Sequence, residues 1–219
     1  MNYLFDKYNW DPSYPTSISN LLRDHIVLTL VSVAIGLAIA FPVGVYAARH
    51  KRVYTPVITV ADVVYTLPSL AFMALLIPFT GLNPPTVVIP LVLYTQIVLI
   101  RNITTGIQAV DPTLMEVGRA MGMTERQVLL RVALPLALPV IVAGIRVATV
   151  TTIGIAAIAP LFGVNSLGYL LVIDGPAFHI NSEIVAGVIL ISALAIVADL
   201  LLLGAQTLLS RGRLIARTA

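Results

Sequence analysis

The chain lacks cysteine and has few charged residues, and both features narrow its class. Only 11% of its 219 residues are charged, whereas soluble domains carry roughly a quarter. Without cysteine there is no disulfide, thiolate nucleophile or cysteine metal ligand. The net charge of +3 is too small to predict a nucleic-acid partner. With a mean hydropathy of +0.98, the composition predicts an integral membrane protein.

A recognisable catalytic set is also missing. The histidines His25, His50 and His179 fall at span ends or in a loop, without metalloprotease spacing or a helical pair. No Gly-Lys-Ser/Thr phosphate loop is present, so we expect no ATP, cofactor or metal site in this chain. A membrane enzyme is therefore disfavoured.

Apolar runs predict five membrane spans, since about 20 residues of helix cross the hydrocarbon core. The runs cover residues 26–48, 54–79, 86–104, 136–159 and 183–209. The segment 160–182 contains glycine and proline and is too polar and broken to cross. Residues 1–25 mix aromatic residues with a few charges, which suits a headgroup-level anchor or an interfacial helix that touches a partner. We expect an all-α integral membrane protein with a single domain over residues 1–219.

Basic residues gather at one set of span ends. That set contains Arg49, Lys51, Arg52, Arg101, Arg119, Arg126, Arg131, Arg211, Arg213 and Arg217. The other set contains only Lys7 and Arg23. Because loops rich in lysine and arginine stay in the cytoplasm, the N-terminus is predicted to lie outside and the C-terminus inside. The polar segment 111–135 is then cytoplasmic.

Three ionisable residues fall inside spans: Asp62, Arg146 and Asp199. A charge in the membrane interior is costly and is normally paired or faces water. We expect Arg146 to pair with one of the two carboxylates. The alternative is that Arg146 extends to the lipid headgroups, and a third hypothesis gives the trio a role in substrate binding.

Prolines within the spans predict broken helices. In a bilayer such breaks occur where they are buried in protein or line a water-filled path. The most polar of these sites is Tyr65-Thr66-Leu67-Pro68-Ser69. We interpret Tyr65, Thr66, Pro68 and Ser69 as pathway or gate residues, with a simple packing kink as the alternative.

The segment 111–135 begins with a predicted short helix. Asp111 is free to cap its first turn, and Pro112 suits the first helical position. Gly122 is placed to end the helix. A tight turn should follow.

A second short helix is predicted to start at Thr124, where Gln127 completes a capping-box pattern. Because the residue before a proline is disfavoured in α-helical geometry, we expect this piece to end at Leu134, before Pro135. Two short helices around a glycine turn also occur in DNA-binding proteins. Neighbouring apolar blocks hold this pair close to the bilayer, which disfavours nucleic acid as a partner.

The spacing of this segment resembles the EAA loop of ABC-importer permeases. In that loop a Glu-Ala-Ala opening, a glycine and a hydrophobic-x-Leu-Pro ending fall at the intervals found here for Glu116, Gly122 and residues 132–135. Val117 and Gly118 replace the two alanines. The family's loop docks into a groove on a cytoplasmic ATPase. The resemblance assigns that docking to Glu116, Val117, Gly118, Arg119, Ala120, Met121, Gly122 and Met123.

Further stretches look like the osmoprotectant branch of these permeases, which takes up glycine betaine, choline, carnitine and related compounds. They are residues 65–78 (YTLPSLAFMALLIP), 91–102 (LVLYTQIVLIRN) and 135–146 (PLALPVIVAGIR), with Gly106 and Val110-Asp111-Pro112 between them. The resemblance implies the type I ABC-importer permease fold, five transmembrane helices with a cytoplasmic coupling helix. It also implies a bacterial or archaeal inner membrane and transport by alternating access.

The same resemblance implies partners: cytoplasmic ABC ATPase subunits that hold ATP and Mg, an extracytoplasmic substrate-binding protein, and a second permease, copy or paralogue. Five helices are too few to enclose a path alone, so a second subunit within the membrane lipid is expected on physical grounds as well. A sister importer of methionine, another amino acid or ergothioneine is one alternative, and an ATP-independent channel or half-transporter is another. Quaternary ammonium ligands are held by aromatic cages, which in these systems belong to the binding protein. Tyr46, Tyr65, Tyr94 and Tyr169 are not expected to form one.

Overall fold

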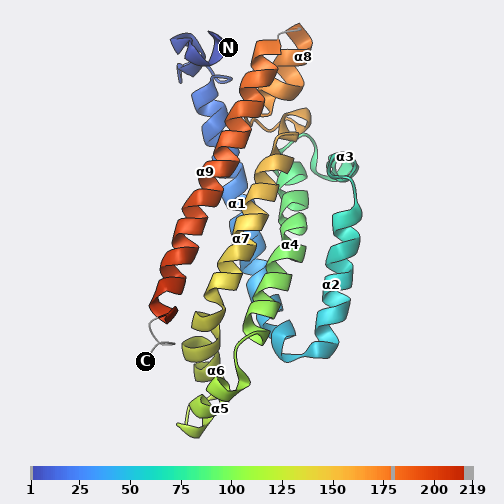
Figure 1. Ribbon diagram of the computed structural model, residues 1–219. Helices are drawn as coiled ribbons and strands as arrows, with labels where there is room; N and C mark the ends of the chain where they lie inside the picture. Colours follow the sequence, from blue (N-terminus) through green and yellow to red (C-terminus); the bar gives the residue numbers. More distant parts are fainter. Residues whose placement is uncertain (1, 179–180, 215–219) are drawn as a thin grey trace.

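The computed structural model describes residues 2–178 and 181–214, which fold into helices without a strand. Four helical segments of this part are long and apolar enough to cross a membrane. They are α1 (Ile18–Arg49), α4 (Pro84–Gln108), the helix Glu125–Ala156, and α9 (Asn181–Leu214). They run side by side as one elongated bundle (Figure 1). The short helices α5 (Pro112–Ala120) and α6 (Glu125–Val128) lie at one end, which we call the hairpin end.

A further crossing, over the apolar run 54–79, is broken just before Pro68, one of the prolines expected to break it. It consists of α2 (Lys51–Thr66) and α3 (Ser69–Thr80), which are bent by 92° relative to each other. Leu67 before Pro68 has extended backbone (φ −66°, ψ 132°), as steric contact with the proline ring requires. In Figure 1, α3 is seen almost end-on beside the top of α2.

The first helix begins earlier than the apolar run indicated. Ser17 caps it by accepting a hydrogen bond from the backbone N–H of Asn20 at 3.5 Å, as serine commonly does at this position. The helix then continues without interruption through Pro42. Two short 3-10 turns, η1 (Asn2–Phe5) and η2 (Lys7–Trp10), precede it.

Helices α1 and α4 approach closely because α1 presents small residues at intervals of four. Gly36, Ala40 and Gly44 are all buried. A Cβ atom added to Gly44 would lie 2.8 Å from the side chain of Ile103, so only glycine fits there. The hydroxyl of Thr104 donates to the carbonyl of Gly44 at 3.1 Å. Small residues at this spacing are typical of helix pairs within membranes.

The helix after α6 continues past Pro135, so the predicted end at Leu134 is wrong. A π-helical segment, η3 (Leu129–Ala133), joins α6 to α7 (Leu134–Ala156). The N–H of Leu134 bonds to the carbonyl of Leu129, five residues back. This wider turn makes room for a proline that lacks an N–H and would clash with a normal turn. Leu134 itself remains helical (φ −62°, ψ −48°).

Segment 160–182 forms no crossing within its described residues, as predicted. It contains the short elements η4 (Ala159–Phe162), η5 (Leu170–Asp174) and α8 (Gly175–Phe178), the last seen at the end of the bundle opposite the hairpin (Figure 1). Phe162 and Leu170 are buried in the bundle. A second π turn, η5, again stands just before an X-Pro pair, Gly175-Pro176.

Candidate functional site

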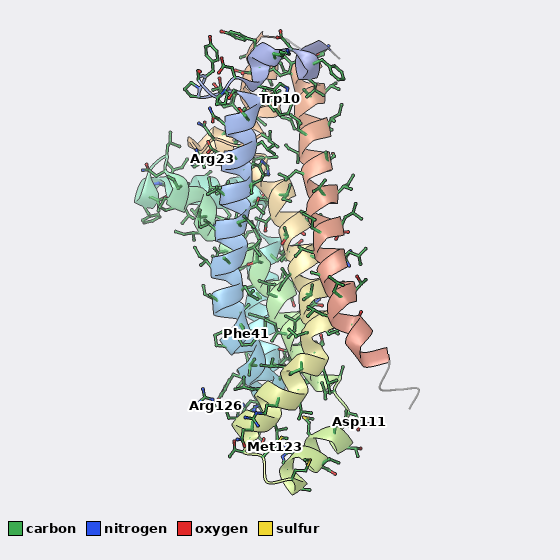
Figure 2. The ribbon with its side chains drawn as sticks, turned by 90° about the vertical axis from the view of Figure 1, so that its left-hand side faces the viewer. Trp10, Arg23, Phe41, Asp111, Met123 and Arg126 are labelled. Carbon is green, nitrogen blue, oxygen red and sulfur yellow. The ribbon has the colours of Figure 1, made fainter. Side chains whose placement is uncertain are left out.

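The turn between α5 and α6 folds as its sequence indicates. Asp111 caps α5, its carboxylate accepting the N–H of Thr113 at 2.8 Å. Gly122 follows with φ +81°, in the left-handed region that favours glycine. Thr124 and Gln127 form the predicted capping box, with bonds of 2.8 Å and 3.3 Å. We call residues 111–128 the α5–α6 hairpin, and Figure 2 shows Asp111 and Met123 at its end of the bundle.

An ion pair closes the hairpin. Arg119 on α5 donates to the Glu125 carboxylate through Nε at 2.6 Å and Nη2 at 3.4 Å. These hydrogen bonds from Arg119 lower the pKa of Glu125, and the positive charges of Arg119 and Arg49 act in the same direction. The pair is solvent-exposed, so it orients the two helices rather than contributing much to stability.

The two faces of α5 differ sharply. Gly118 is buried, with its Cβ position 3.4 Å from Val128, so this face packs on the bundle. Beside this packed side, Leu114 and Val117 of α5 and its C-cap residue Met121 are exposed, Met121 to 72%. Val117 thus points away from the side that packs. Having valine here instead of the second residue of the Glu-Ala-Ala pattern therefore leaves the packing of α5 unchanged.

The structure places the predicted docking residues together on α5 and the following turn. Glu116, Arg119, Ala120 and Gly122 are exposed. Met123 is half-buried. The hairpin therefore carries an outward apolar stripe of Leu114, Val117 and Met121, flanked by charged residues. Leu114 lies outside the predicted docking set, although its helical spacing to the other two could have revealed it.

The hairpin is also tied to the corner between α1 and α2. Arg49 donates from Nη2 to the backbone carbonyl of Glu125 at 3.1 Å. A cavity of about 650 Å³ lies beside this contact, and Met115 and Gln108 are among its lining residues. In the sequence, Arg49 indicated only which side of the membrane is cytoplasmic. Its contact connects residues 76 positions apart, which no local pattern reveals.

Two of the three intramembrane charges are joined directly. Arg146 on α7 donates to Asp199 on α9 through Nε at 3.0 Å and Nη2 at 2.8 Å, which confirms the expected pairing. Gln206 accepts from the remaining Nη1 at 2.8 Å. Asp62 instead meets Arg101 of α4 at 3.3 Å. Neither Gln206 nor Arg101 was predicted as a partner.

The break between α2 and α3, which we call the elbow, brings aromatic rings together. Tyr65, Thr66 and Pro68 are exposed there, and Ser69 is half-buried. The ring of Tyr94 stands edge-on to that of Tyr65, with centroids 5.9 Å apart.

The ring of Phe72 lies 6.0 Å from that of Tyr94. The sequence did not predict that Tyr65 and Tyr94 would lie in contact. Tyr46, by contrast, stacks on His50 near the other end of α2.

Solved structures of ABC transporters share this fold. One similar solved structure is an inward-facing methionine ABC transporter, MetNI, with a TM-score of 0.76 at 21% identity, covering 88% of this chain and 95% of that one. An amino acid ABC transporter gives a TM-score of 0.62 at 23% identity, with 87% and 91% covered. The architecture is that of an ABC-importer permease.

The chain belongs to the family of binding-protein-dependent transport system inner membrane components, whose sequence profile matches residues 40–214. It is therefore a multi-pass membrane transport subunit. It is 41% identical to a carnitine transport permease protein, OpuCD, of Listeria monocytogenes, over 92% of this chain and 89% of the relative. It is 39% identical to the glycine betaine/carnitine/choline permease protein OpuCD of Bacillus subtilis, with 81% and 78% covered. The osmoprotectant import permease protein OsmW of Salmonella typhimurium is 38% identical, with 88% and 92% covered.

Proposed function

We propose that this chain is the permease subunit of an ATP-driven importer of osmoprotectants such as glycine betaine, choline or carnitine. The observation that carries the substrate class is the 41% identity to a carnitine permease across most of both chains. The methionine transporter supports the fold alone, because it is only 21% identical. Alternating access then requires partners that this chain lacks: a second permease, ABC ATPases and a substrate-binding protein.

The α5–α6 hairpin is the surface we assign to the ATPase. An exposed apolar stripe rimmed by charges is typical of a protein interface, and here it comprises Leu114, Val117 and Met121. Figure 2 shows Arg126 at the hairpin end and Arg23 towards the other. The positive-inside rule therefore favours a cytoplasmic hairpin and an extracytoplasmic N-terminus.

The helix Glu125–Ala156 gives this docking a mechanical consequence. In the proposed cycle, closure of the ATPase dimer on ATP moves the groove that holds residues 116–123. Because the chain stays helical from Glu125 into the membrane, the hairpin and the fourth crossing tilt together. The interface with the second permease opens outward, substrate enters from the binding protein, and hydrolysis restores the inward-facing state.

Reconstitution tests this proposal. The chain is purified together with an ABC ATPase, a second permease and a substrate-binding protein and placed in vesicles containing ATP, and uptake of labelled glycine betaine, choline, carnitine and methionine is measured. We expect ATP-dependent uptake of the first three. Methionine uptake alone would favour the sister importer, and uptake without ATP would favour a channel.

A pair of variants tests the docking surface. Met121→Asp places a charge in the apolar stripe and should abolish co-purification of the ATPase. Leu82→Asp is the matched control, because Leu82 is 58% exposed and lies between α3 and α4, far along the chain from the hairpin. Retention of the ATPase by Met121→Asp and by Val117→Asp would contradict the assignment.

A further inference from the structure

The elbow lies deep enough in the bilayer that its non-helical backbone must be shielded from lipid. The stretch of α2 from Lys51 to Thr66 is about 24 Å long at 1.5 Å per residue. This places the elbow within a hydrocarbon core of about 30 Å measured from the hairpin end. Its backbone leaves helical geometry at Leu67, whose side chain is 42% exposed. Irregular backbone at membrane depth is tolerated against protein or water rather than lipid. The elbow therefore faces a subunit interface or an aqueous path.

Three aromatic rings surround this elbow. Tyr94 is buried, and its hydroxyl donates to the carbonyl of Leu67 at 2.7 Å, which fixes both its ring and the break. Tyr65 and Phe72 stand nearly perpendicular to it, at 88° and 86°. Tyr65 remains 44% exposed. The three rings, which we call the aromatic corner, come from α2, α3 and α4: Tyr65 and Phe72 both contact the buried Tyr94.

Below the aromatic corner, on the same seam between α2 and α4, lies an ion pair. Asp62 is three residues before Tyr65, and Arg101 is seven residues after Tyr94, so each shares a helix face with its tyrosine. Asp62 and Arg101 meet at 3.3 Å, and both are about half exposed. Because the pair is neutral overall, it neither repels a cation nor supplies a free carboxylate to hold one.

We propose that the aromatic corner is a transit site for the quaternary ammonium group of the substrate within the membrane. Aromatic faces attract such groups through cation–π interactions, and the corner offers two partly open rings braced by a third. Glycine betaine, choline and carnitine share a trimethylammonium group, so one corner serves all three. The site rests on the proposed function, which supplies this substrate class.

The natural absence of cysteine permits a direct test. In the complete transporter in nanodiscs, Thr66→Cys introduces a single thiol into this subunit beside the corner, and Ser69→Cys gives a second reporter. We expect a water-soluble maleimide to label both. Choline should slow the labelling, whereas 3,3-dimethylbutanol, its uncharged isostere, should not. Failure of both thiols to label would mean that water does not reach the elbow, which would overturn the proposal, and equal effects of choline and the isostere would exclude cation–π binding.

Ring variants complete the test in the Thr66→Cys background. Tyr65→Leu should raise the choline concentration for half-protection by about 3- to 30-fold, the range expected for a cation–π contact. Tyr65→Phe keeps the ring and should retain protection. Tyr46→Leu is the matched control, since Tyr46 is an exposed tyrosine outside the corner. Unchanged protection in Tyr65→Leu would overturn the proposal.

Different results would reject the transit site and the proposed function. ATP-dependent osmoprotectant uptake by the unmodified transporter together with unchanged protection in Tyr65→Leu would reject the transit site alone. Absence of any osmoprotectant uptake, with uptake of another substrate, would reject the proposed function.

Discussion

Arg146 and Asp199 join α7 to α9 through a fork of two hydrogen bonds, 3.0 Å and 2.8 Å long. Removing one partner leaves the other charge unpaired within a span, which is costly. We expect Asp199→Asn to lower the thermal unfolding midpoint of the purified transporter by several degrees. Asp62→Asn should cost less, because the Asp62–Arg101 contact is a single longer bond between half-exposed groups.

A double variant separates charge pairing from helix packing. Arg146→Met combined with Asp199→Leu removes both charges and should recover much of the lost midpoint, since apolar pairs often replace ion pairs without loss. Thermal unfolding of the single and double variants in the same nanodiscs measures the effect. If the double variant is as unstable as Asp199→Asn, the two hydrogen bonds of the fork stabilise the helix pair beyond cancelling the charges of Arg146 and Asp199.

Gly122 should be sensitive to any side chain, because its φ of +81° is unfavourable for other residues. The penalty in the left-handed region is about 1–2 kcal/mol, concentrated in the turn of the hairpin. Gly122→Leu should therefore weaken the coupling of ATP hydrolysis to uptake while the spans still assemble. ATPase activity and uptake are measured in the same vesicles.

Gly118→Ala is the comparison for this variant. A methyl group there would sit 3.4 Å from Val128, in ordinary contact, so coupling should be nearly normal. A larger residue, as in Gly118→Leu, should push α5 off the bundle. Normal coupled uptake in Gly122→Leu would count against the hairpin as the coupling element.

The hairpin's ion pair should be insensitive to pH across the neutral range. Because the pKa of Glu125 is held below its ordinary value of 4.5, the pair is fully formed above that pH. Its stabilising effect is lost only as the pH falls through the lowered pKa. NMR titration of the Glu125 carboxyl should give a midpoint below 4.5, and Arg119→Gln should move it upward. A midpoint at or above the ordinary value in the unmodified protein would disprove the pairing.

The N-terminal turns should loosen at alkaline pH. Burial, together with the negative charges of Glu183 and Asp174, raises the pKa of Tyr3 to about 12 from 10.0. The neutral phenol is therefore favoured in the folded segment. Its stabilising effect is complete below pH 10 and disappears as the pH rises through about 12.

The single tryptophan provides the readout for this transition. The Trp10 indole donates to the carbonyl of Leu4 at 2.9 Å, so its fluorescence reports on the N-terminal turns. Tyr3→Phe should abolish the alkaline step while circular dichroism stays the same. An identical step in Tyr3→Phe would assign it to another group.

Local chemistry was predictable from the sequence. The capping box of Thr124 and Gln127 depends on residues three apart, and glycine at 122 is required by a local turn. The pairing of Arg146 was predictable for a different reason, because so few charges enter the membrane that each has few possible partners.

Contacts between distant segments were not predictable in the same way. Tyr65 and Tyr94 meet only because α2 ends at the elbow, a position and an angle that depend on packing against α4. The rule for the residue before a proline held at Leu67 and failed at Leu134, where a π turn absorbed the proline. A single sequence gives no means of distinguishing those two outcomes.

Through the π turn at residues 129–133, α6 continues into the fourth crossing without a non-helical residue. From Glu125 to Ala156 the chain is one rod of 32 residues, about 48 Å long at 1.5 Å per residue. A swing of about 5° at the hairpin would carry the far end of such a rod through about 4 Å, given that length. Pro135 thus lies inside a continuous helix, along which a small displacement at the hairpin grows with distance across the membrane.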